Sequence, residues 1–504
     1  MPARRLSPLS VFYRAGETVM RLAWLLVIAT VGSRSMGVPT EVGVGVVAGG
    51  LVLAMVYQFV YWERYEYELT EDTFDIRSGV LSRRTREIPL GRVQNVDLRR
   101  NVLQRALGLA EVSLETAGGS ETEAQLRFVG EAEAQRLRDA VSRRKRGVSG
   151  DSTEPEPEAD LLFAITPREL LILGVTSVDL RLLSLASVFL PVVVPSLTDR
   201  FGDPLVSFAM TAPVAAFALA VVAAVLSGLY SVTNYYGFRL SRTGSELRYE
   251  RGLLQQFAGT IPLEKVQTMA VSENVLARRL GYASLSVETA GYAPGDSSGS
   301  QSAVPLAERD RVFRLARSID SFGEPDWQRP PGRARTRYVV RYVAAVLVLT
   351  GIAYAVDRFT GFSYAWYLVL LGVPLAPVGA HLKWRNLAYA VCEDHVLTRA
   401  GFWSRETRVV PFYRIQTVVH SQSVFQRRRR LATVLIDTAG GGGITGSDAR
   451  AVDIDADAAA ELRETVHDRL QDSLDEARAV RRRERLESIT TGGAGSAPDV
   501  SPTD

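Results

Sequence analysis

The sequence predicts an α+β membrane protein in which three helical hairpins alternate with three copies of one small β-rich module that ends in a helix. Long uncharged runs come in pairs, and each pair precedes a charged stretch of module length. One phrase recurs once in each module, as Ile88–Gln94 (IPLGRVQ), Ile261–Gln267 (IPLEKVQ) and Val410–Gln416 (VPFYRIQ).

Fixed spacing around this phrase shows that the modules are copies of one structural unit. A glycine stands ten residues before each proline, and the distance from each glutamine to the threonine of a later Thr-Ala-Gly is the same in all three copies. A constant offset across a varied interior indicates an internal repeat. The repeated positions are Gly79, Pro89, Gln94 and Gly118; Gly252, Pro262, Gln267 and Gly291; and Gly401, Pro411, Gln416 and Gly440.

Composition excludes several classes of protein. With 504 residues, 23% charged residues and a net charge of +3, the chain is neither an acidic disordered tail nor a strongly basic nucleic-acid binder. Its single cysteine, Cys392, excludes a disulfide framework and a cysteine-based metal site.

Six apolar runs predict six transmembrane helices in three hairpins. The second run, for example, has 21 residues without a charge, enough to cross about 30 Å of hydrocarbon. A further amphipathic segment, Pro167–Leu173, suits a position along the membrane interface. The six runs are about Val19–Ser35, Val42–Trp62, Leu182–Leu197, Leu205–Tyr230, Tyr338–Val356 and Phe362–Leu382.

These runs divide the chain into alternating membrane and soluble parts. Each module begins with alternating strand patterns, contains a short helix such as Asn101–Leu107, and closes with a longer helix. The predicted order is an N-terminal segment with hairpin 1 (1–64), module 1 (65–146), a linker (147–160), hairpin 2 (161–237), module 2 (238–322), a linker (323–337), hairpin 3 (338–388), module 3 (389–470), and a charged helix with a disordered tail (471–504).

Charge predicts the orientation. The turns inside the hairpins hold one arginine each (Arg34, Arg200 and Arg358), whereas the opposite side holds Arg4, Arg5, Arg14 and the arginine-rich modules. The positive-inside rule therefore places both termini and all three modules in the cytoplasm of a multi-pass cell-membrane protein. An even number of helices before each module gives the same orientation.

The whole pattern resembles the membrane-flanked bacterial PH-like domains of the YdbS/YdbT family, in its three-copy form. The resemblance is carried by Ile-Pro-Leu-x-x-Val-Gln, the Ser-Gly or Arg-Gly turn, Leu-Gly and Glu-Thr-Ala-Gly after paired membrane helices. It implies that each module is a bent, seven-stranded antiparallel β-barrel closed by a C-terminal helix. Module 3 departs from the pattern, with Arg430 in place of Gly108 and Gly281, and Phe412 in place of leucine.

The proline phrase has a structural explanation and a functional one. Proline lacks a backbone donor and so suits the start of an edge strand, where the glutamine satisfies nearby backbone groups. A binding role stays open because the residue three after the proline is basic in every copy: Arg92, Lys265 and Arg414.

Arginine clusters are the second candidate. They are either a solvated face or a surface that docks on anionic lipid headgroups, where each basic residue contributes about 1 kcal/mol. The residues predicted to contact the membrane surface or a partner are Arg83, Arg84, Arg86, Arg92, Lys265, Arg278, Arg279 and Arg414.

Other motifs carry no chemistry. Gly440–Gly443 lacks the lysine of a phosphate loop. The calcium-like spacing of Asp453, Asp455 and Asp457 has Ala458 where that loop needs glycine, so capping of a helix is the preferred interpretation. The four histidines have no ligand spacing, no catalytic set repeats, and we predict neither a metal nor a cofactor.

The sequence thus predicts a non-enzymatic membrane scaffold with three cytoplasmic PH-like modules for lipid or protein interaction, acting in envelope or membrane homeostasis. Its expected partners are the membrane, anionic headgroups and other membrane proteins, but not nucleic acid. The alternatives are a transporter or export component, disfavoured because the membrane runs lack interior acidic or histidine residues, and a headgroup enzyme, which would need clustered carboxylates or histidines.

Overall fold

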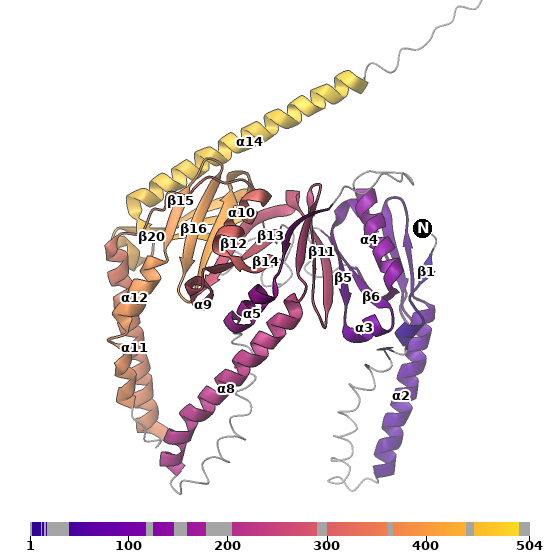
Figure 1. Ribbon diagram of the computed structural model, residues 1–504, viewed down its shortest axis with the longest axis horizontal. Coiled ribbons are helices and arrows are strands. Elements are labelled where there is room, and N and C mark those ends of the chain that lie inside the picture. The colour runs from indigo at the N-terminus through magenta and orange to yellow at the C-terminus, as the bar shows by residue number, and fades with distance from the viewer. Residues whose placement is uncertain are drawn as a thin grey trace, which may run out of the picture. The chain divides into compact units, whose positions relative to one another are not determined.

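The computed structural model describes residues 3–11, 13–14, 17, 40–116, 124–145, 159–177, 204–289, 300–360, 366–439 and 448–492 (Figure 1). The chain forms two compact units, Met1–Lys265 and Val266–Asp504. The boundary between them falls inside the second copy of the proline phrase. The reason is that the strands before that phrase belong to one sheet and the strands after it to another.

Module 1 follows the apolar helix α2. Its elements are β1 (Arg4–Arg5), α2 (Thr40–Glu63), β2 (Glu66–Leu69), β3 (Thr73–Ser78), β4 (Arg84–Pro89), η1 (Leu90–Arg92), β5 (Val93–Arg100), α3 (Val102–Ala106), β6 (Leu109–Thr116), β7 (Ala124–Gly130) and α4 (Glu131–Lys145).

Module 2 repeats this order and is divided between the two units. The first unit holds β8 (Asp160–Ala164), α5 (Pro167–Thr176), α8 (Pro204–Tyr235), β9 (Arg239–Thr243), β10 (Glu246–Arg251), β11 (Gln256–Pro262) and η2 (Leu263–Lys265). The second unit holds β12 (Val266–Asn274), α9 (Val275–Arg279), β13 (Tyr282–Thr289), β14 (Ser300–Glu308) and α10 (Arg309–Ile319).

Module 3 ends in the longest helix of the described chain. Its elements are α11 (Gly332–Thr360), η3 (Trp366–Gly372), α12 (Ala376–Arg385), β15 (Ala388–Val391), β16 (His395–Gly401), β17 (Ser404–Pro411), η4 (Phe412–Arg414), β18 (Ile415–Ser421), α13 (Val424–Arg427), β19 (Leu431–Thr438), β20 (Ala449–Asp455) and α14 (Ala456–Gly492). The first residues of the expected tail thus belong to α14.

Consecutive modules share their sheets, so the expectation of three closed barrels is wrong. The four sheets run β1-β2-β3-β4, β7-β6-β5-β11-β10-β9-β8, β14-β13-β12-β17-β16-β15 and β18-β19-β20. Strand β5 of module 1 pairs with β11 of module 2, and β12 of module 2 pairs with β17 of module 3. A strand whose edge bonds to a neighbouring module has no free edge with which to close a barrel of its own.

Each proline phrase is the corner at which the chain leaves one sheet and enters the next. Pro89, Pro262 and Pro411 end strands β4, β11 and β17, and a short 3₁₀ helix follows each of them. This corrects the expected position at the start of an edge strand, because a proline φ near −65° also fits the entry to a 3₁₀ turn. Of the three strands that end in these prolines, only β4 lies at the edge of its sheet, since β11 and β17 lie inside shared sheets.

The glutamine of the phrase occupies a β-bulge in every copy. The register shifts between Val93 and Asn95, between Val266 and Thr268, and between Ile415 and Thr417. The skipped residues are Gln94, Gln267 and Gln416. A bulge places one extra residue in one strand and bends it, which accounts for the constant position of glutamine after the corner.

The glycine ten residues before each proline is required by its backbone. Gly79, Gly252 and Gly401 have φ of 116°, 107° and 127°. A Cβ atom at these positions would lie 1.9, 1.7 and 1.7 Å from the carbonyl oxygens of Ser82, Gln255 and Ser404. No residue but glycine fits a turn of this kind. The corresponding Thr-Ala-Gly glycines, Gly118, Gly291 and Gly440, lie outside the described residues.

A second turn shows how module 3 departs from the pattern. Gly108 and Gly281 follow the short helices α3 and α9 with φ of 64° and 78°. Arg430 occupies the same place after α13 and keeps the left-handed conformation, with φ of 50°. The departure therefore changes the side chain and leaves the turn in place.

Asparagine or serine begins each of these short helices. The side chains of Asn101, Asn274 and Ser423 accept a hydrogen bond from the backbone N–H three residues later. At α14 the cap is Asp455, whose Oδ1 accepts from the N–H of Asp457 at 3.1 Å, in agreement with the capping interpretation.

Each module also takes a short segment from in front of its hairpin. Arg4 pairs with Tyr67, β8 pairs with β9, and Gln328 forms a bridge with Tyr389. The chain just before each predicted hairpin thus bonds to the first strand after it, as a strand for β1 and β8 and as a single bridge for Gln328. The two residues of β1 and the one bridging residue are too short to show a periodic pattern in the sequence.

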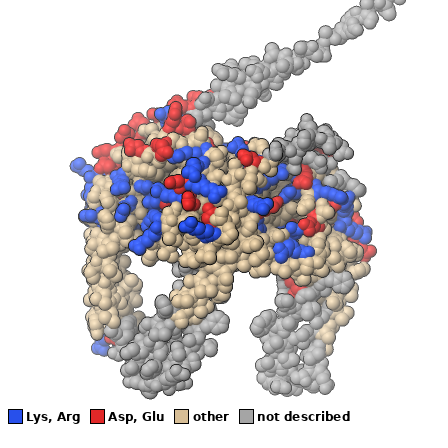
Figure 2. Space-filling model, in the orientation of Figure 1, with Lys and Arg blue, Asp and Glu red and all other residues tan. Residues whose placement is uncertain are grey.

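Three helical segments in the described chain are long and apolar enough to cross a membrane: Ala218–Tyr235, Gly332–Phe359 and Trp366–Arg385. The middle of the α11 and α12 pair shows no charged side chains on the visible surface, whereas charged side chains gather over the strands and near the helix ends (Figure 2). The expected spans Val19–Ser35 and Leu182–Leu197 lie outside the described residues, so six helices stay a prediction. The sixth span is interrupted between η3 and α12, where Pro374 lacks a backbone donor.

Helix packing inside the first unit depends on two glycines. A Cβ on Gly228 of α8 would lie 2.6 Å from the carbonyl oxygen of Gly174 in α5. The amphipathic segment expected at Pro167–Leu173 is thus part of α5 and contacts α8 closely, as small residues allow for membrane helices.

Candidate functional site

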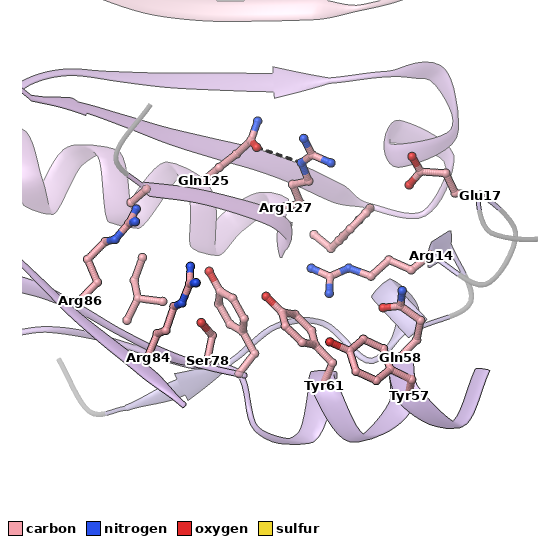
Figure 3. Close-up of a pocket in the computed structure, with 14 residues that line it drawn as sticks. Arg14, Glu17, Tyr57, Gln58, Tyr61, Ser78, Arg84, Arg86, Gln125 and Arg127 are labelled. Carbon is pink, nitrogen blue, oxygen red and sulfur yellow. Dashed lines mark hydrogen bonds between the residues drawn. The ribbon is translucent and has the colours of Figure 1, made fainter. Parts of the chain in front are cut away.

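A cavity of about 510 Å³ lies in module 1 at the end of the apolar helix α2. Four separate segments line it: the N-terminal segment with Arg14, the last turns of α2, strands β3 and β4, and strand β7 (Figure 3). The turn at Gly79 brings β4 back next to β3, and β7 lines the third side.

The lining is strongly basic. Arg14, Arg84, Arg86 and Arg127 face a single acidic residue, Glu17. Arg84 and Arg86 come from alternate positions of β4 and therefore share a face of that strand. In Figure 3 the guanidinium groups of Arg14 and Arg84 point toward the space between them. This arrangement favours an anion.

One of these arginines is positioned by a neighbouring amide. Arg127 Nε donates a hydrogen bond to Gln125 Oε1 at 3.0 Å (Figure 3). Gln125 in turn donates from Nε2 to the Glu111 carboxylate. Only one nitrogen of the guanidinium is used in this contact, so the others can bind a ligand in the bidentate manner typical of arginine and phosphate.

Aromatic rings form the other wall. Tyr57, Tyr61 and Tyr65 follow one another at intervals of four residues, with ring centroids 6.4 Å apart for the first pair and 5.8 Å for the second. Arg14 lies over the rings of Tyr61 and Phe128, with its Cζ atom 4.9 and 5.3 Å from the centroids. Such cation–π contacts hold the arginine in place without using its N–H donors.

Tyr65 contributes a neutral hydroxyl. Burial raises the pKa of Tyr65 well above its usual value, the neighbouring Tyr61 raises it further, and Arg14 and Arg86 oppose the shift. The phenol therefore keeps its proton throughout the physiological range and can donate it to an anionic oxygen.

The place of the cavity determines which anion can reach it. Tyr57 and Tyr61 belong to the end of α2, a helix that exposes Val52, Leu53 and Val56 on its surface. Tyrosines at the end of an apolar helix mark the level of the lipid headgroups. An anion in this cavity would thus lie where the phosphate layer of a bilayer meets the soluble module.

The structure places the eight predicted binding residues at several separate positions. Arg84 and Arg86 line the cavity, whereas Arg83 precedes β4 outside it. Arg92, Lys265 and Arg414 are the last residues of η1, η2 and η4, so the shared basic position belongs to the corner. Arg279 is exposed at the end of α9, and the pKa of its neighbour Arg278 is lowered, first by burial and then by Arg405.

Several lining residues were missed by reasoning from the sequence: Arg14, Tyr57, Tyr61, Tyr65, Arg127 and Phe128. One signal was present, because tyrosines at positions 57, 61 and 65 have the four-residue spacing of one helix face, although α2 ends at Glu63 and Tyr65 follows it. Phe128 had no such signal. It has a positive φ of 81° in the bulge of β7.

Comparison with known proteins matches the three copies seen in the structure. The pattern of the family described as "Bacterial PH domain" fits residues 22–145, 178–322 and 338–470. The UPF0699 transmembrane protein YdbT of Bacillus subtilis (strain 168) is 25% identical over 468 residues, which cover 86% of this chain and 92% of the relative. The UPF0699 transmembrane protein YdbS of the same organism is 27% identical over 157 residues, 30% of this chain and 97% of the relative. No solved structure gives a significant match. This chain therefore belongs to the Bacterial PH domain family, as a membrane protein with three copies of the family's module.

Proposed function

We propose that this protein is a non-enzymatic, multi-pass membrane scaffold whose modules lie on the cytoplasmic face, and that module 1 binds an anionic glycerophospholipid headgroup. The observation that carries the proposal is the cavity at the end of α2, with four arginines against one carboxylate. A role in envelope or membrane homeostasis is the process that such a scaffold would serve.

Strand pairing supports the placement of all three modules on one side. The segments before and after each hairpin are hydrogen-bonded to each other, through β1 and β2, through β8 and β9, and through the bridge between Gln328 and Tyr389, so the chain must cross the membrane an even number of times between them. The pairs β5·β11 and β12·β17 then require adjacent modules to share a side. The excess of arginine outside the hairpin turns favours the cytoplasm as that side.

The cavity favours a lipid over a soluble anion. Tyrosines at the end of an apolar helix are typical of the headgroup level, so the acyl chains of a bound lipid would remain beside the exposed apolar face of α2. A free phosphate ion would gain the charge contacts alone. Charge also selects anionic over zwitterionic lipids, since the lining has a net positive charge.

Ligand-induced stabilisation of the full chain in detergent tests the proposal. Dihexanoylphosphatidylglycerol should raise Tm, because a ligand that binds only the folded state stabilises it by an amount that grows with the logarithm of ligand concentration above Kd. Dihexanoylphosphatidylcholine has the same acyl chains and should leave Tm unchanged. Arg84→Gln should abolish the shift with the anionic lipid.

Arg83→Gln is the matched control, since it removes an adjacent arginine that does not line the cavity. It should keep the shift. Equal effects of the two lipids, an equal effect of inorganic phosphate, or equal losses for Arg83→Gln and Arg84→Gln would each contradict a headgroup site in this cavity.

A further inference from the structure

The first and the last module each have an edge strand that corresponds to strands paired between modules elsewhere in the chain. Among the described residues, strand β4 is one of the two edges of the first sheet, and β18 is one of the two edges of the last. Their counterparts in the other modules are paired: β11 and β17 correspond to β4, and β5 and β12 correspond to β18. We propose that β18 of one molecule binds β4 of a second copy, so that the protein assembles head to tail.

Both internal junctions use one register. At the first, Gln256 lies opposite Arg100, and at the second Arg405 lies opposite Glu273. In each case the first residue is six before the proline and the second is six after the glutamine. The same positions at the free edges are Arg83 and Gln422. If the proposed contact uses the register of the two internal junctions, Arg83 lies opposite Gln422.

Side chains at this position are complementary in every junction. Arg100 Nη2 donates to Gln256 Oε1 at 2.7 Å. Arg405 donates to both carboxylate oxygens of Glu273, each at 2.8 Å. The free edges offer Arg83 and Gln422. This is again an arginine and a glutamine, as at the first junction, but each residue type is on the other strand.

A second ion pair at the module 2–module 3 junction has its counterparts on the free edges. Arg408 Nη1 donates to Glu288 Oε1 at 2.9 Å, and both residues are buried. Arg408 stands three residues before its proline and Glu288 one residue before its threonine. The corresponding free-edge residues are Arg86 and Asp437, again a cation and a carboxylate.

Exposure distinguishes the free edges from their paired counterparts. Residues Arg84–Glu87 of β4 are all exposed, whereas Thr407–Pro411 of β17 are all buried. Most of β18 is exposed and most of β12 is buried. An edge strand presents a row of backbone donors and acceptors to any strand of fitting register.

Charged residues on β4 do not by themselves mark a strand that stays unpaired. Charges often protect an edge from association, yet β17 contains Arg405, Glu406 and Arg408 and lies inside a sheet. A contact between different patches on two copies is heterologous, so repeated association gives a ring or a filament.

Cysteine cross-linking in membranes tests the contact. In a Cys392→Ser background, one tagged chain carries Thr85→Cys and a second carries His420→Cys. These two exposed residues would lie opposite each other, as Thr407 lies opposite Val271. Oxidation of the mixture should give a covalent dimer that contains both tags. Either chain alone should stay monomeric, because β4 is not expected to pair with β4, nor β18 with β18.

A charge exchange tests specificity. Arg86→Glu should reduce the cross-linked product at least about tenfold, because two carboxyl groups would then face each other. Asp437→Arg in the other chain should restore the product. The control Arg92→Glu changes an exposed arginine outside β4 and should leave it unchanged.

With the single-cysteine chains, three results would overturn the proposal: no mixed dimer, equal dimer from one chain alone, or failure of Asp437→Arg to rescue Arg86→Glu. A chain that carries both cysteines distinguishes pairing within one molecule from pairing between molecules. A ladder of cross-linked oligomers supports assembly. A cross-linked monomer of altered electrophoretic mobility would show that β4 and β18 pair within one molecule, and would contradict pairing with a second copy.

Discussion

Asp453 is fully buried, and its Oδ1 accepts a hydrogen bond from Gln426 Nε2 at 2.7 Å. The same carboxylate accepts hydrogen bonds from Arg337 and from the hydroxyl of Tyr338, both at the start of α11. The donors thus come from a membrane helix and from the short helix α13, while the acceptor lies on β20. The network fastens hairpin 3 to module 3.

Replacement of Asp453 should therefore destabilise module 3 severely. Removing one partner of a buried ion pair costs about 3–5 kcal/mol, because the other charge stays buried without compensation. Asp453→Ala should lower the Tm of the full chain far more than Asp455→Ala, which removes a half-buried helix cap worth about 1 kcal/mol and a partly exposed ion pair with Arg333 worth about 0–1 kcal/mol. Circular dichroism during heating measures both. Similar Tm values for the two variants would show that the network contributes little.

The turn glycine of module 3 gives a second prediction. Gly401→Ala would place a Cβ 1.7 Å from the carbonyl oxygen of Ser404 at a φ of 127°, so we expect a loss of more than about 1 kcal/mol. Gly91→Ala is the control, since a Cβ there has no atom within 4 Å and the backbone needs no positive φ. Equal denaturation midpoints for the two variants would contradict the steric explanation.

Arg430 should respond in the opposite direction. Its φ of 50° is costly for a residue with a Cβ, by roughly 1–2 kcal/mol, and its counterparts Gly108 and Gly281 avoid that cost. Arg430→Gly should raise Tm. The comparison is Arg428→Gly, because Arg428 has an ordinary helical φ of −60° and gains nothing from glycine. A lower Tm for Arg430→Gly than for Arg428→Gly would refute this expectation.

The stability of module 3 should depend on the ionisation of Asp448. Burial raises the pKa of this carboxyl above 3.8, and the nearby Asp437 raises it further. Between the unfolded and folded pKa values the unfolded chain releases the proton first, so stability falls as pH rises through the folded value. Asp448→Asn removes this loss and should raise Tm at pH 7 but not below pH 3.8. A gain of the same size at both pH values would point to another cause.

The sequence was sufficient for features that one module contains within itself. The fixed spacing of Gly79, Pro89 and Gln94 arises from a strained turn, a corner and a bulge, each defined within a few residues. The family and the membrane character followed from the same repeats and from the apolar runs. These inferences succeed because local backbone geometry constrains residue types directly.

What the sequence did not reveal depends on distant partners. No local pattern tells that Gln256 lies opposite Arg100, so sheet sharing was missed and closed barrels were expected instead. The cavity likewise collects Arg14, Tyr61, Arg84 and Arg127 from four segments. The edge-strand interpretation of the proline failed for a related reason: a missing donor is tolerated equally well at the last residue of an interior strand.

The charges of the junction residues also determine which modules can lie next to each other. Arg100 faces a neutral amide and Glu273 faces a guanidinium. If modules 1 and 3 were made adjacent, Arg100 would confront Arg405 and like charges would repel. The order of the modules is thus specified by their junction residues as well as by the covalent chain. If module 2 were deleted, one of these two arginines would have to be replaced for modules 1 and 3 to pair.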